Sequence, residues 1–346
     1  LLAIIPTALF SILLFYPPFL EEKPENLRWL FFFQAGYYIF LTLYIVPYNA
    51  LMPDLARSKD QKLQISMYLS LSYVLGIIVA SQVPLLASHS SRDTGMASFH
   101  DYRIAILIVN SIAVVFMVLP VLVVNEQKYC TSKPSSVSVF TSLKMVLSNK
   151  LFLLFLVADA SFFITIAIIT SGVLYYVKVL LGLPEKVGSY FLVGMIFLSL
   201  LCYPLVVRLA KAKGKRILVL IAFAVFGLIF LWISFMGKLP FSSYFQISLV
   251  AVLSAFPAAV LGIMPYAIIA ETADQSSKKT GENTEGMFFA VRTFADKFGQ
   301  TIGVAGFAIL MVFGKDPEND LGIRLSAWLG FAICILAFSV FWFWKE

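Results

Sequence analysis

Residues 262–286 read GIMPYAIIAETADQSSKKTGENTEG, an apolar stretch that turns polar at Glu271. A second stretch, residues 44–62, reads YIVPYNALMPDLARSKDQK and has the same order of features. Each carries Pro-Tyr late in an apolar run, then an acidic residue where the run ends, then a basic polar segment. The acidic residues are Asp54 and Glu271. Two such stretches in one chain predict an internal repeat.

The composition around these stretches is typical of a membrane protein. Of the 346 residues, 60% are hydrophobic and 13% are charged, whereas soluble domains are about 45 to 50% apolar and about 25% charged. A run of about 20 apolar residues is long enough to cross a hydrocarbon core of roughly 30 Å. Ten such segments are predicted, at 1–16, 27–52, 63–87, 103–124, 151–178, 187–209, 216–236, 242–270, 286–313 and 322–344.

The residue inventory gives no sign of an enzyme. Cys130, Cys202 and Cys334 are far apart, and both histidines fall in one predicted loop, so neither metal-ligand nor redox spacing is present. The glycine motifs of phosphate sites and nucleophile elbows do not occur in the sequence. The basic residues are scattered over the loops and form no dense stripe. We therefore expect no catalysis, no metal and no nucleic-acid partner.

The charges of the predicted loops indicate the orientation of the chain. One set of alternating loops carries fourteen Lys or Arg against seven acidic residues, and the other set carries nine against nine. Because cytoplasmic loops are enriched in Lys and Arg, the first set is predicted to be cytoplasmic in a multi-pass protein of the plasma (inner) membrane. Its loops are residues 53–62, 125–150, 208–216 and 271–285.

The position of the repeat predicts the domain organisation. The two Pro-Tyr stretches end the second and eighth segments, which point the same way, so the repeat is six helices. We predict an N-terminal bundle in residues 1–124, a cytoplasmic linker in 125–150 and a C-terminal bundle in 151–346. The first segment begins inside an apolar run without Met, and two further helices are expected upstream. Twelve helices in two halves resemble the all-α fold of the major facilitator superfamily, in which the substrate path lies between the halves.

A more specific resemblance lies in AIIAETADQSSKKTGENTEGMFFAVRTFADKFGQTIG. It is similar to the loop between the tenth and eleventh helices of the glycoside-pentoside-hexuronide:cation symporters, the family of melibiose permease. VPYNALMPDL and SGVLYYVKVLLGLPE resemble two other parts of that family. The resemblance implies a secondary transporter of a sugar or glycoside, coupled to H⁺ or Na⁺ without another cofactor, and a monomer in the lipid bilayer. The matching residues of the first segment are Glu271, Asp274, Lys279, Thr280, Gly281, Glu285, Gly286 and Lys297.

The sequence departs from this family at its sugar and cation site. The fourth-helix aspartate position falls at Tyr44 or Ile45, the tryptophan position near Asn49 and the fifth-helix arginine position near Ser70. Aromatic stacking and carboxylate hydrogen bonds usually hold sugars, so an amphipathic solute such as a lysophospholipid is the alternative substrate. A membrane protein without transport activity is the third hypothesis. One carboxylate fewer weakens a Na⁺ cage and favours proton coupling.

Few charges fall inside the predicted helices, and they are the candidates for coupling. Lys297 lies about twelve residues, roughly 18 Å, into its helix, and the resemblance implies a role in the coupling site; the alternative is a static ion pair. Asp159 either takes a proton or pairs with Lys297 or Arg292. Asp296 follows Arg292 by four residues, so these two are predicted to pair on one helix face.

Charges at the predicted cytoplasmic helix ends are expected to form a gate that pairs in one state and faces water in the other. The acidic pair at 271 and 274 is expected to meet basic residues of the 53–62 loop, unless it belongs to a solvated loop that only orients the helix. The gate candidates are Asp54, Arg57, Lys59, Lys62, Glu271 and Asp274. Candidates for the substrate path, each alternatively a packing residue, are Tyr37, Tyr44, Tyr48, Asn49, Thr165, Thr170 and Gln300.

Overall fold

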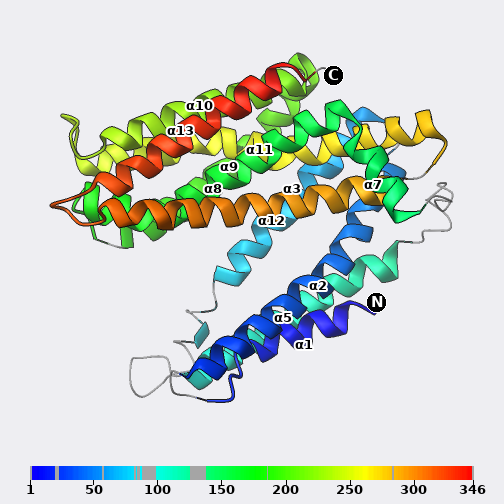
Figure 1. Cartoon of the computed structure of the whole chain (residues 1–346), viewed down its shortest axis with the longest axis horizontal. Coiled ribbons are helices and arrows are strands. Elements are labelled where there is room, and N and C mark those ends of the chain that lie inside the picture. Colours follow the sequence, from blue (N-terminus) through cyan, green and yellow to red (C-terminus); the bar gives the residue numbers. More distant parts are fainter. Residues whose placement is uncertain are drawn as a thin grey trace. The chain divides into compact units, whose positions relative to one another are not determined.

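The structure is a computed structural model that describes residues 2–19, 23–56, 58–81, 83, 86–87, 99–124, 138–184, 186–282 and 284–344. Almost all of these residues are helical, and Figure 1 labels the helices along the chain. Within the described ranges, nine helices are long and apolar enough to cross a membrane. The first predicted segment is a shorter helix, α1 (Ile4–Leu13), of 10 residues.

The chain divides into two compact units, and each is described by itself. One unit comprises Leu1–Leu55 and Leu71–Lys133, and the other comprises Ala56–Ser70 and Pro134–Glu346. Helix α3 (Lys59–Ser81) therefore contributes its first part to the second unit and its remainder to the first.

In the first unit, α1 packs against α2 (Pro24–Leu55) and α5 (Phe99–Val123). Gly36 of α2 lies directly against the Phe10 ring, where a Cβ atom would clash. Two aromatic polar groups donate to backbone carbonyls: Trp29 Nε1 to Leu13 O at 2.9 Å, and the Tyr44 hydroxyl to Met117 O at 2.8 Å. Because buried aromatic N–H and O–H groups need partners, these bonds help to fix α2 against its neighbours.

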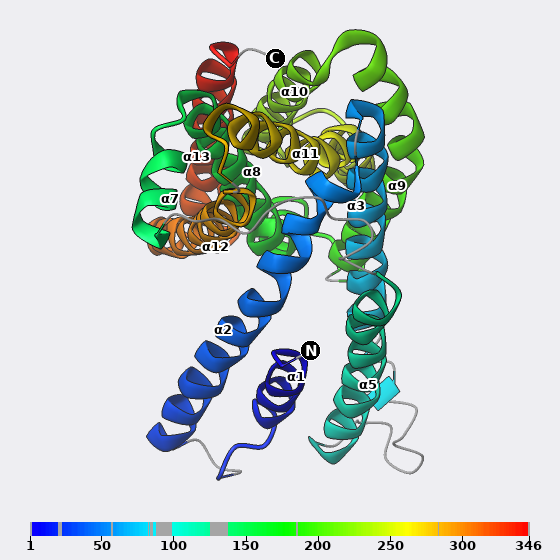
Figure 2. The same ribbon diagram turned by 90° about the vertical axis from the view of Figure 1, so that its right-hand side faces the viewer.

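The second unit holds the remaining helices. Its packing runs α12 against α8, α8 against α13, α13 against α10, α10 against α11 and α11 against α9, and α8 lies beside α12 in both views (Figure 2). A π-helical turn at Tyr176–Leu180 continues α8, and a 3-10 turn at Met311–Phe313 follows α12. The helices are α7 (Val139–Leu147), α8 (Lys150–Tyr175), α9 (Lys186–Lys213), α10 (Lys215–Phe235), α11 (Ser243–Thr280), α12 (Glu285–Leu310) and α13 (Leu321–Trp342).

Two glycines set the close approach of α12 to α8. A Cβ atom at Gly299 would lie 2.7 Å from the Ala160 carbonyl oxygen, and one at Gly303 would lie 2.7 Å from the Ala167 Cβ. Glycines four residues apart lie on one face and let two helix backbones approach in a membrane. This contact fixes the register of the two helices and so decides which polar groups face each other along them.

The polar stretch after Glu271 is mostly helix, which corrects the predicted loop at 271–285. α11 runs for 38 residues to Thr280, and Gly281 ends it with a φ of 73°, a left-handed conformation that glycine adopts without a Cβ clash. The Ala, Gln, Lys and Ser residues of this stretch are compatible with a helix in water, so its polarity did not mark the helix end. The predicted linker likewise contains α7, and residues 125–137 lie outside the described residues.

Candidate functional site

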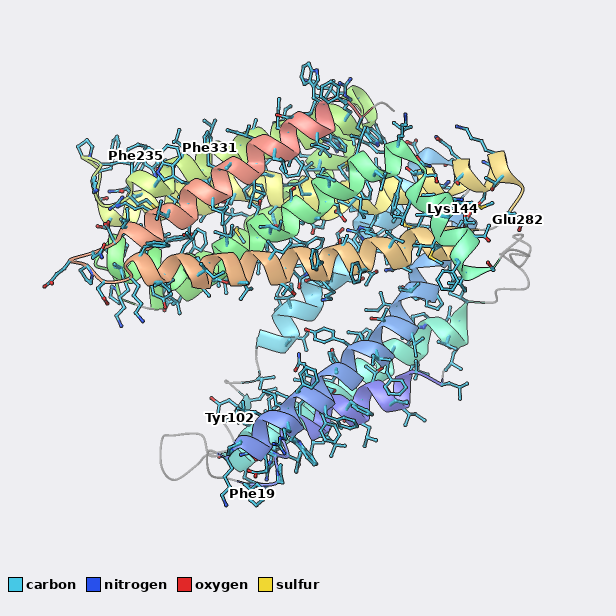
Figure 3. All side chains as sticks on the ribbon, in the orientation of Figure 1. Phe19, Tyr102, Lys144, Phe235, Glu282 and Phe331 are labelled. Carbon is cyan, nitrogen blue, oxygen red and sulfur yellow. The ribbon has the colours of Figure 1, made fainter. Side chains whose placement is uncertain are left out.

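Loops that were predicted to share one side of the membrane meet at one end of the second unit. Lys144 of α7 and Glu282 after α11 lie at this end, and Phe235 of α10 lies at the other (Figure 3). Lys211 Nζ at the end of α9 lies 3.0 Å from Asp60 Oδ2 at the start of α3. The second unit thus brings together parts of all four loops of the predicted cytoplasmic set.

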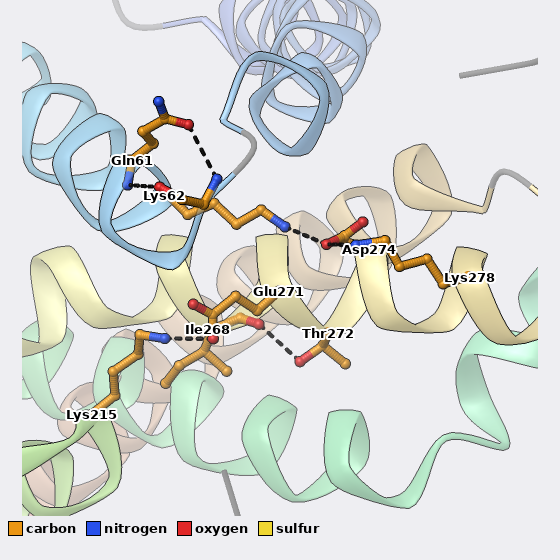
Figure 4. Close-up of polar contacts among 9 residues, drawn as sticks. Gln61, Lys62, Lys215, Ile268, Glu271, Thr272, Asp274 and Lys278 are labelled. Atoms are coloured by element: carbon orange, nitrogen blue, oxygen red, sulfur yellow. Dashed lines mark hydrogen bonds and ion pairs between the residues drawn. The ribbon is translucent and has the colours of Figure 1, made fainter. Parts of the chain in front are cut away.

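Two ion pairs bind the polar end of α11 to other helices, and we call their four residues the latch. Lys62 Nζ of α3 donates to Asp274 Oδ2 at 2.7 Å. Lys215 Nζ at the start of α10 lies 2.5 Å from Glu271 Oε2. Figure 4 shows both pairs, together with Lys278, whose amine donates to the same Asp274 oxygen at 3.0 Å.

The Lys62 pair has one enclosed and one hydrated partner. The Lys62 side chain is 4% exposed, whereas that of Asp274 is 27% exposed. The Ser70 hydroxyl donates to Gly262 O at 2.6 Å and holds the same part of α3 on α11. A buried ammonium requires a partner or water, so Lys62 needs Asp274 while α3 is packed on α11. When α3 separates, water can replace the Lys62 amine at the partly exposed Asp274 carboxylate.

Glu271 was predicted to meet Arg57, Lys59 or Lys62, and it pairs with Lys215 instead. Residues three apart on a helix project roughly 60° from each other, so the two acids of α11 face different neighbours. Asp274 faces α3, and Glu271 faces the start of α10. The predicted gate residue Arg57 lies outside the described residues, as do the side chains of Asp54 and Lys59.

A polar cavity of about 470 Å³ lies next to the latch. Its walls come from the end of α7, the start of α8 and the polar end of α11, and they include Glu271, Ser276 and Lys279. Of the four latch residues, Glu271 lines this cavity.

A second ionic cluster lies between α8 and α12, and we call Asp159, Arg292 and Asp296 the buried triad. Arg292 Nε donates to Asp159 Oδ2 at 2.8 Å, and Nη2 donates to Asp159 Oδ1 at 3.4 Å. The same Nη2 lies 3.9 Å from Asp296 Oδ2. The guanidinium also lies over the Tyr266 ring of α11, 4.4 Å from its centroid, an arrangement in which the ring face attracts the cation.

The three side chains of the triad differ in exposure. The side chain of Asp159 is 0% exposed, that of Arg292 5% and that of Asp296 14%. The sequence predicted the contact within α12, but the shorter contacts of Arg292 reach across to α8. Asp159 therefore pairs with Arg292, one of the partners weighed for it, while Lys297 has an exposed side chain on α12.

The aromatic path candidates lie on α2 in the first unit. The rings of Tyr44 and Tyr48 stack with centroids 6.0 Å apart, and both line a cavity of about 630 Å³ whose other walls are mostly apolar. Tyr37 instead contacts the ring of Tyr38, at a centroid distance of 5.5 Å, and Asn49 is half-buried.

The polar path candidates of the second unit differ in exposure. Thr165 is fully buried, and its hydroxyl donates to Ser161 O at 2.8 Å, so it belongs to a packed helix interface. Thr170 is exposed and donates to Ile166 O at 2.9 Å, and Gln300 is half-buried.

Nine membrane-length helices in the described ranges, with ionic groups held between them, define a multi-pass membrane protein. The chain belongs to the MFS/sugar transport protein family, whose model matches residues 1–344. This confirms the family resemblance predicted from the sequence. The protein is accordingly a membrane transporter homologue and not an enzyme.

Three curated relatives have names that agree with this family. The isoprimeverose transporter of Lactiplantibacillus pentosus is 21% identical over 91% of this chain. The uncharacterized symporter YnaJ of Bacillus subtilis is 25% identical over 93%, and the glucuronide carrier protein homolog of Escherichia coli is 22% identical over 98%. The chain spans 65%, 70% and 74% of the length of these proteins, respectively.

Solved structures show the same fold. The proton:xylose symporter XylE superposes with a TM-score of 0.71 at 14% identity, covering 100% of this chain and 79% of that one. The transporter FucP in its outward conformation gives a TM-score of 0.67 at 13% identity, covering 100% of this chain and 82% of that one. The predicted major facilitator fold is thereby confirmed.

Proposed function

We propose that the protein carries a sugar or glycoside across the membrane together with a proton, by alternating access. The observation that carries this proposal is the latch, because it joins helices through ion pairs, one of which has a partly exposed carboxylate at Asp274. A transporter of this kind must close and reopen one mouth in each cycle, and ion pairs at helix ends supply two arrangements of similar energy. Of the relatives, the isoprimeverose transporter and the glucuronide carrier homolog are named for sugar compounds, which supports the substrate class.

In this mechanism, the Lys62 to Asp274 pair holds the predicted cytoplasmic end of α3 on α11. Opening that end separates the pair, and the carboxylate exchanges Lys62 for water while it keeps its contact with Lys278. The Lys215 to Glu271 pair keeps α10 and α11 together, since both of its side chains are buried. The two pairs therefore have different roles. The Lys62 to Asp274 pair breaks and releases α3, whereas the Lys215 to Glu271 pair stays intact and holds α10 against α11.

An amphipathic solute is the second candidate substrate. The cavity of about 630 Å³ in the first unit supports it, because apolar walls and two tyrosines line that cavity. Such a lining suits an acyl chain with a polar head better than it suits a bare sugar.

Uptake into proteoliposomes tests the proposal. The purified full-length protein is assayed with radiolabelled isoprimeverose, a glucuronide and a lysophospholipid, under a pH gradient alone or a Na⁺ gradient alone. We expect accumulation of a sugar compound under the pH gradient without Na⁺. Uptake that requires Na⁺ and ignores the pH gradient contradicts proton coupling, uptake of only the lysophospholipid selects the second substrate, and no uptake of any of them contradicts the transport proposal for these solutes.

A further inference from the structure

We propose that Asp296 is the proton-binding group of the buried triad, and that Asp159 is the carboxylate that Arg292 holds. The place of this proton in transport rests on the proposed function, whereas the assignment of the proton to one carboxyl group does not. The argument uses the charges, the hydrogen bonds and the exposure of the three side chains.

The triad holds one positive and two potentially negative groups. Arg292 donates two hydrogen bonds to Asp159, from Nε at 2.8 Å and from Nη2 at 3.4 Å. A guanidinium that meets a carboxylate with two donors is the strongest common arrangement for keeping both ionised. The Tyr266 ring, 4.4 Å from the guanidinium carbon, restrains the cation in this position. One carboxylate is thus neutralised, and it is Asp159.

Asp296 is left with a poorer environment for a negative charge. Its Oδ2 lies 3.9 Å from Arg292 Nη2, which is too far for a hydrogen bond. Its Oδ1 is buried and has no hydrogen-bond partner among the described residues. A buried carboxylate without compensating hydrogen bonds is costly. Proton binding removes that charge and creates an O–H donor, for which the Asp159 carboxylate is the acceptor.

Lys297, the other cation near Asp296, does not neutralise the Asp296 carboxylate in place of a proton. Lys297 follows Asp296 in the chain, so its side chain projects roughly 100° away around the helix. Its side chain is exposed, and its electrostatic attraction for Asp296 is weaker than that of Arg292.

The remaining titratable groups on the helices packed against α12 have other surroundings. On α11, Tyr266 lies under Arg292, and Glu271 binds Lys215. On α7, Lys144 is exposed. On α13, Arg324 binds Asp320, and the Cys334 thiol lies 3.8 Å from the Thr165 hydroxyl.

Exposure gives Asp296 a route for the proton. Its side chain is 14% exposed, whereas that of Asp159 is 0% exposed. A proton can therefore reach Asp296 from the surface of the unit without breaking the Asp159 pair. Binding and release then change the net charge of the three triad residues between zero and minus one.

Infrared difference spectroscopy of the full-length protein in lipid tests this assignment through the C=O stretch of protonated carboxyl groups. In a pH titration, the wild-type protein should show a buried carboxyl band that vanishes as Asp296 ionises. Asp296→Asn should remove this band. Asp159→Asn should keep it but move its titration to lower pH by about one to three units, because the second negative charge is gone and the Arg292 donors become available to Asp296. Asp320→Asn, outside the triad, should leave the band unchanged.

Other results overturn the assignment. A wild-type protein without a titrating buried carboxyl shows that Asp296 is ionised throughout. A band that persists in Asp296→Asn and vanishes in Asp159→Asn places the proton on Asp159. If Asp296→Asn does not fold, Asp296→Glu serves instead, and an unchanged band position and titration in that variant also contradicts the proposal. The expected spectra combined with no solute uptake refute only the transport function.

Discussion

The latch and the buried triad are both ion-pair clusters of the second unit, and they differ in how far their carboxylate side chains are exposed. In the latch, the Asp274 side chain is 27% exposed and contacts two amines, one buried and one exposed. In the triad, Asp159 is 0% exposed and a single guanidinium serves two carboxyl groups. Removing one partner of a buried ion pair typically costs about 3 to 5 kcal/mol, whereas exposed pairs contribute about 0 to 1 kcal/mol. The Lys62 to Asp274 pair of the latch is therefore suited to opening, and the triad to changing its protonation while its helices stay together.

The largest expected effect follows from removing the triad cation. Arg292→Met leaves two carboxyl groups without their cation, and we expect a loss of about 3 to 5 kcal/mol of stability. Thermal unfolding of the purified full-length protein measures it. The control is Arg208→Met, which removes an exposed cation of α9.

A second variant sharpens the same test. Adding Asp159→Asn to Arg292→Met removes the stranded charge, so the double variant should unfold at a higher temperature than the single one. If Arg292→Met unfolds like the wild type, the triad does not contribute as a buried ionic cluster.

Lys297 separates transport from stability. Its side chain is exposed, so Lys297→Ala should lower the unfolding temperature much less than Arg292→Met does, yet it should abolish gradient-driven uptake if the residue belongs to the coupling site. Lys297→Arg should retain uptake because the charge remains. Uptake at the wild-type level in the alanine variant would remove Lys297 from the coupling site.

A smaller effect is expected at the latch. Lys62→Gln weakens a pair of about 1 kcal/mol, which corresponds to roughly a fivefold shift toward the open arrangement. A cysteine introduced at Ser66, which is buried on α3 one turn from Lys62, reports this shift through its labelling rate with a membrane-impermeant maleimide after the native cysteines are replaced.

Lys278→Gln is the matched control for the latch, since the Lys278 amine contacts the same Asp274 oxygen from an exposed position. Its labelling rate should change less than twofold. Equal rates for Lys62→Gln and the wild type would show that the pair does not hold α3 closed.

The smallest effect is expected at an ion pair outside both clusters. A hydrogen bond from Arg324 lowers the pKa of Asp320 from its ordinary value of 3.8. A lowered folded-state pKa adds stability above the unfolded value, and that stability is lost as the pH falls through the folded value. Asp320→Asn should therefore cost about 0.5 kcal/mol near pH 7 and less near pH 3.

Thermal unfolding at the two pH values measures the Asp320 effect, with Glu318→Gln in the same connection as the exposed control. A cost of equal size at both pH values would mean that the carboxylate charge is not its source.

The sequence predicted the membrane class and the family because both depend on local patterns. Apolar length predicted nine of the helices, and the Pro-Tyr and acidic exit at Glu271 indicated the family. The helix end was misplaced because a helix in water tolerates polar residues, and only Gly281 signalled where α11 ends.

The partners across helices were harder to predict. Arg292 and Asp159 are 133 residues apart, and their contact depends on how α12 docks on α8. The spacing of Gly299 and Gly303 was the one signal in the sequence for that docking. Lys215 was counted only as an orienting loop charge, so its contact with Glu271 was missed, whereas Lys62 and Asp274 were among the pairs considered and do meet.

The unbroken helix α11 has a mechanical consequence. Pro257 and Pro265 lie within it and cannot donate backbone hydrogen bonds, so the helix bends most easily near these two residues. From Pro265 to Thr280 the helix is roughly 22 Å long, so a bend of about 10° at Pro265 would swing its tip by roughly 4 Å. That displacement is larger than the 2.7 Å separation of Lys62 Nζ and Asp274 Oδ2. Tyr266 follows Pro265, and its ring lies under Arg292 of the triad. A bend of α11 at Pro265 would therefore begin beside the triad and displace the part of α11 that carries the latch residues Glu271 and Asp274.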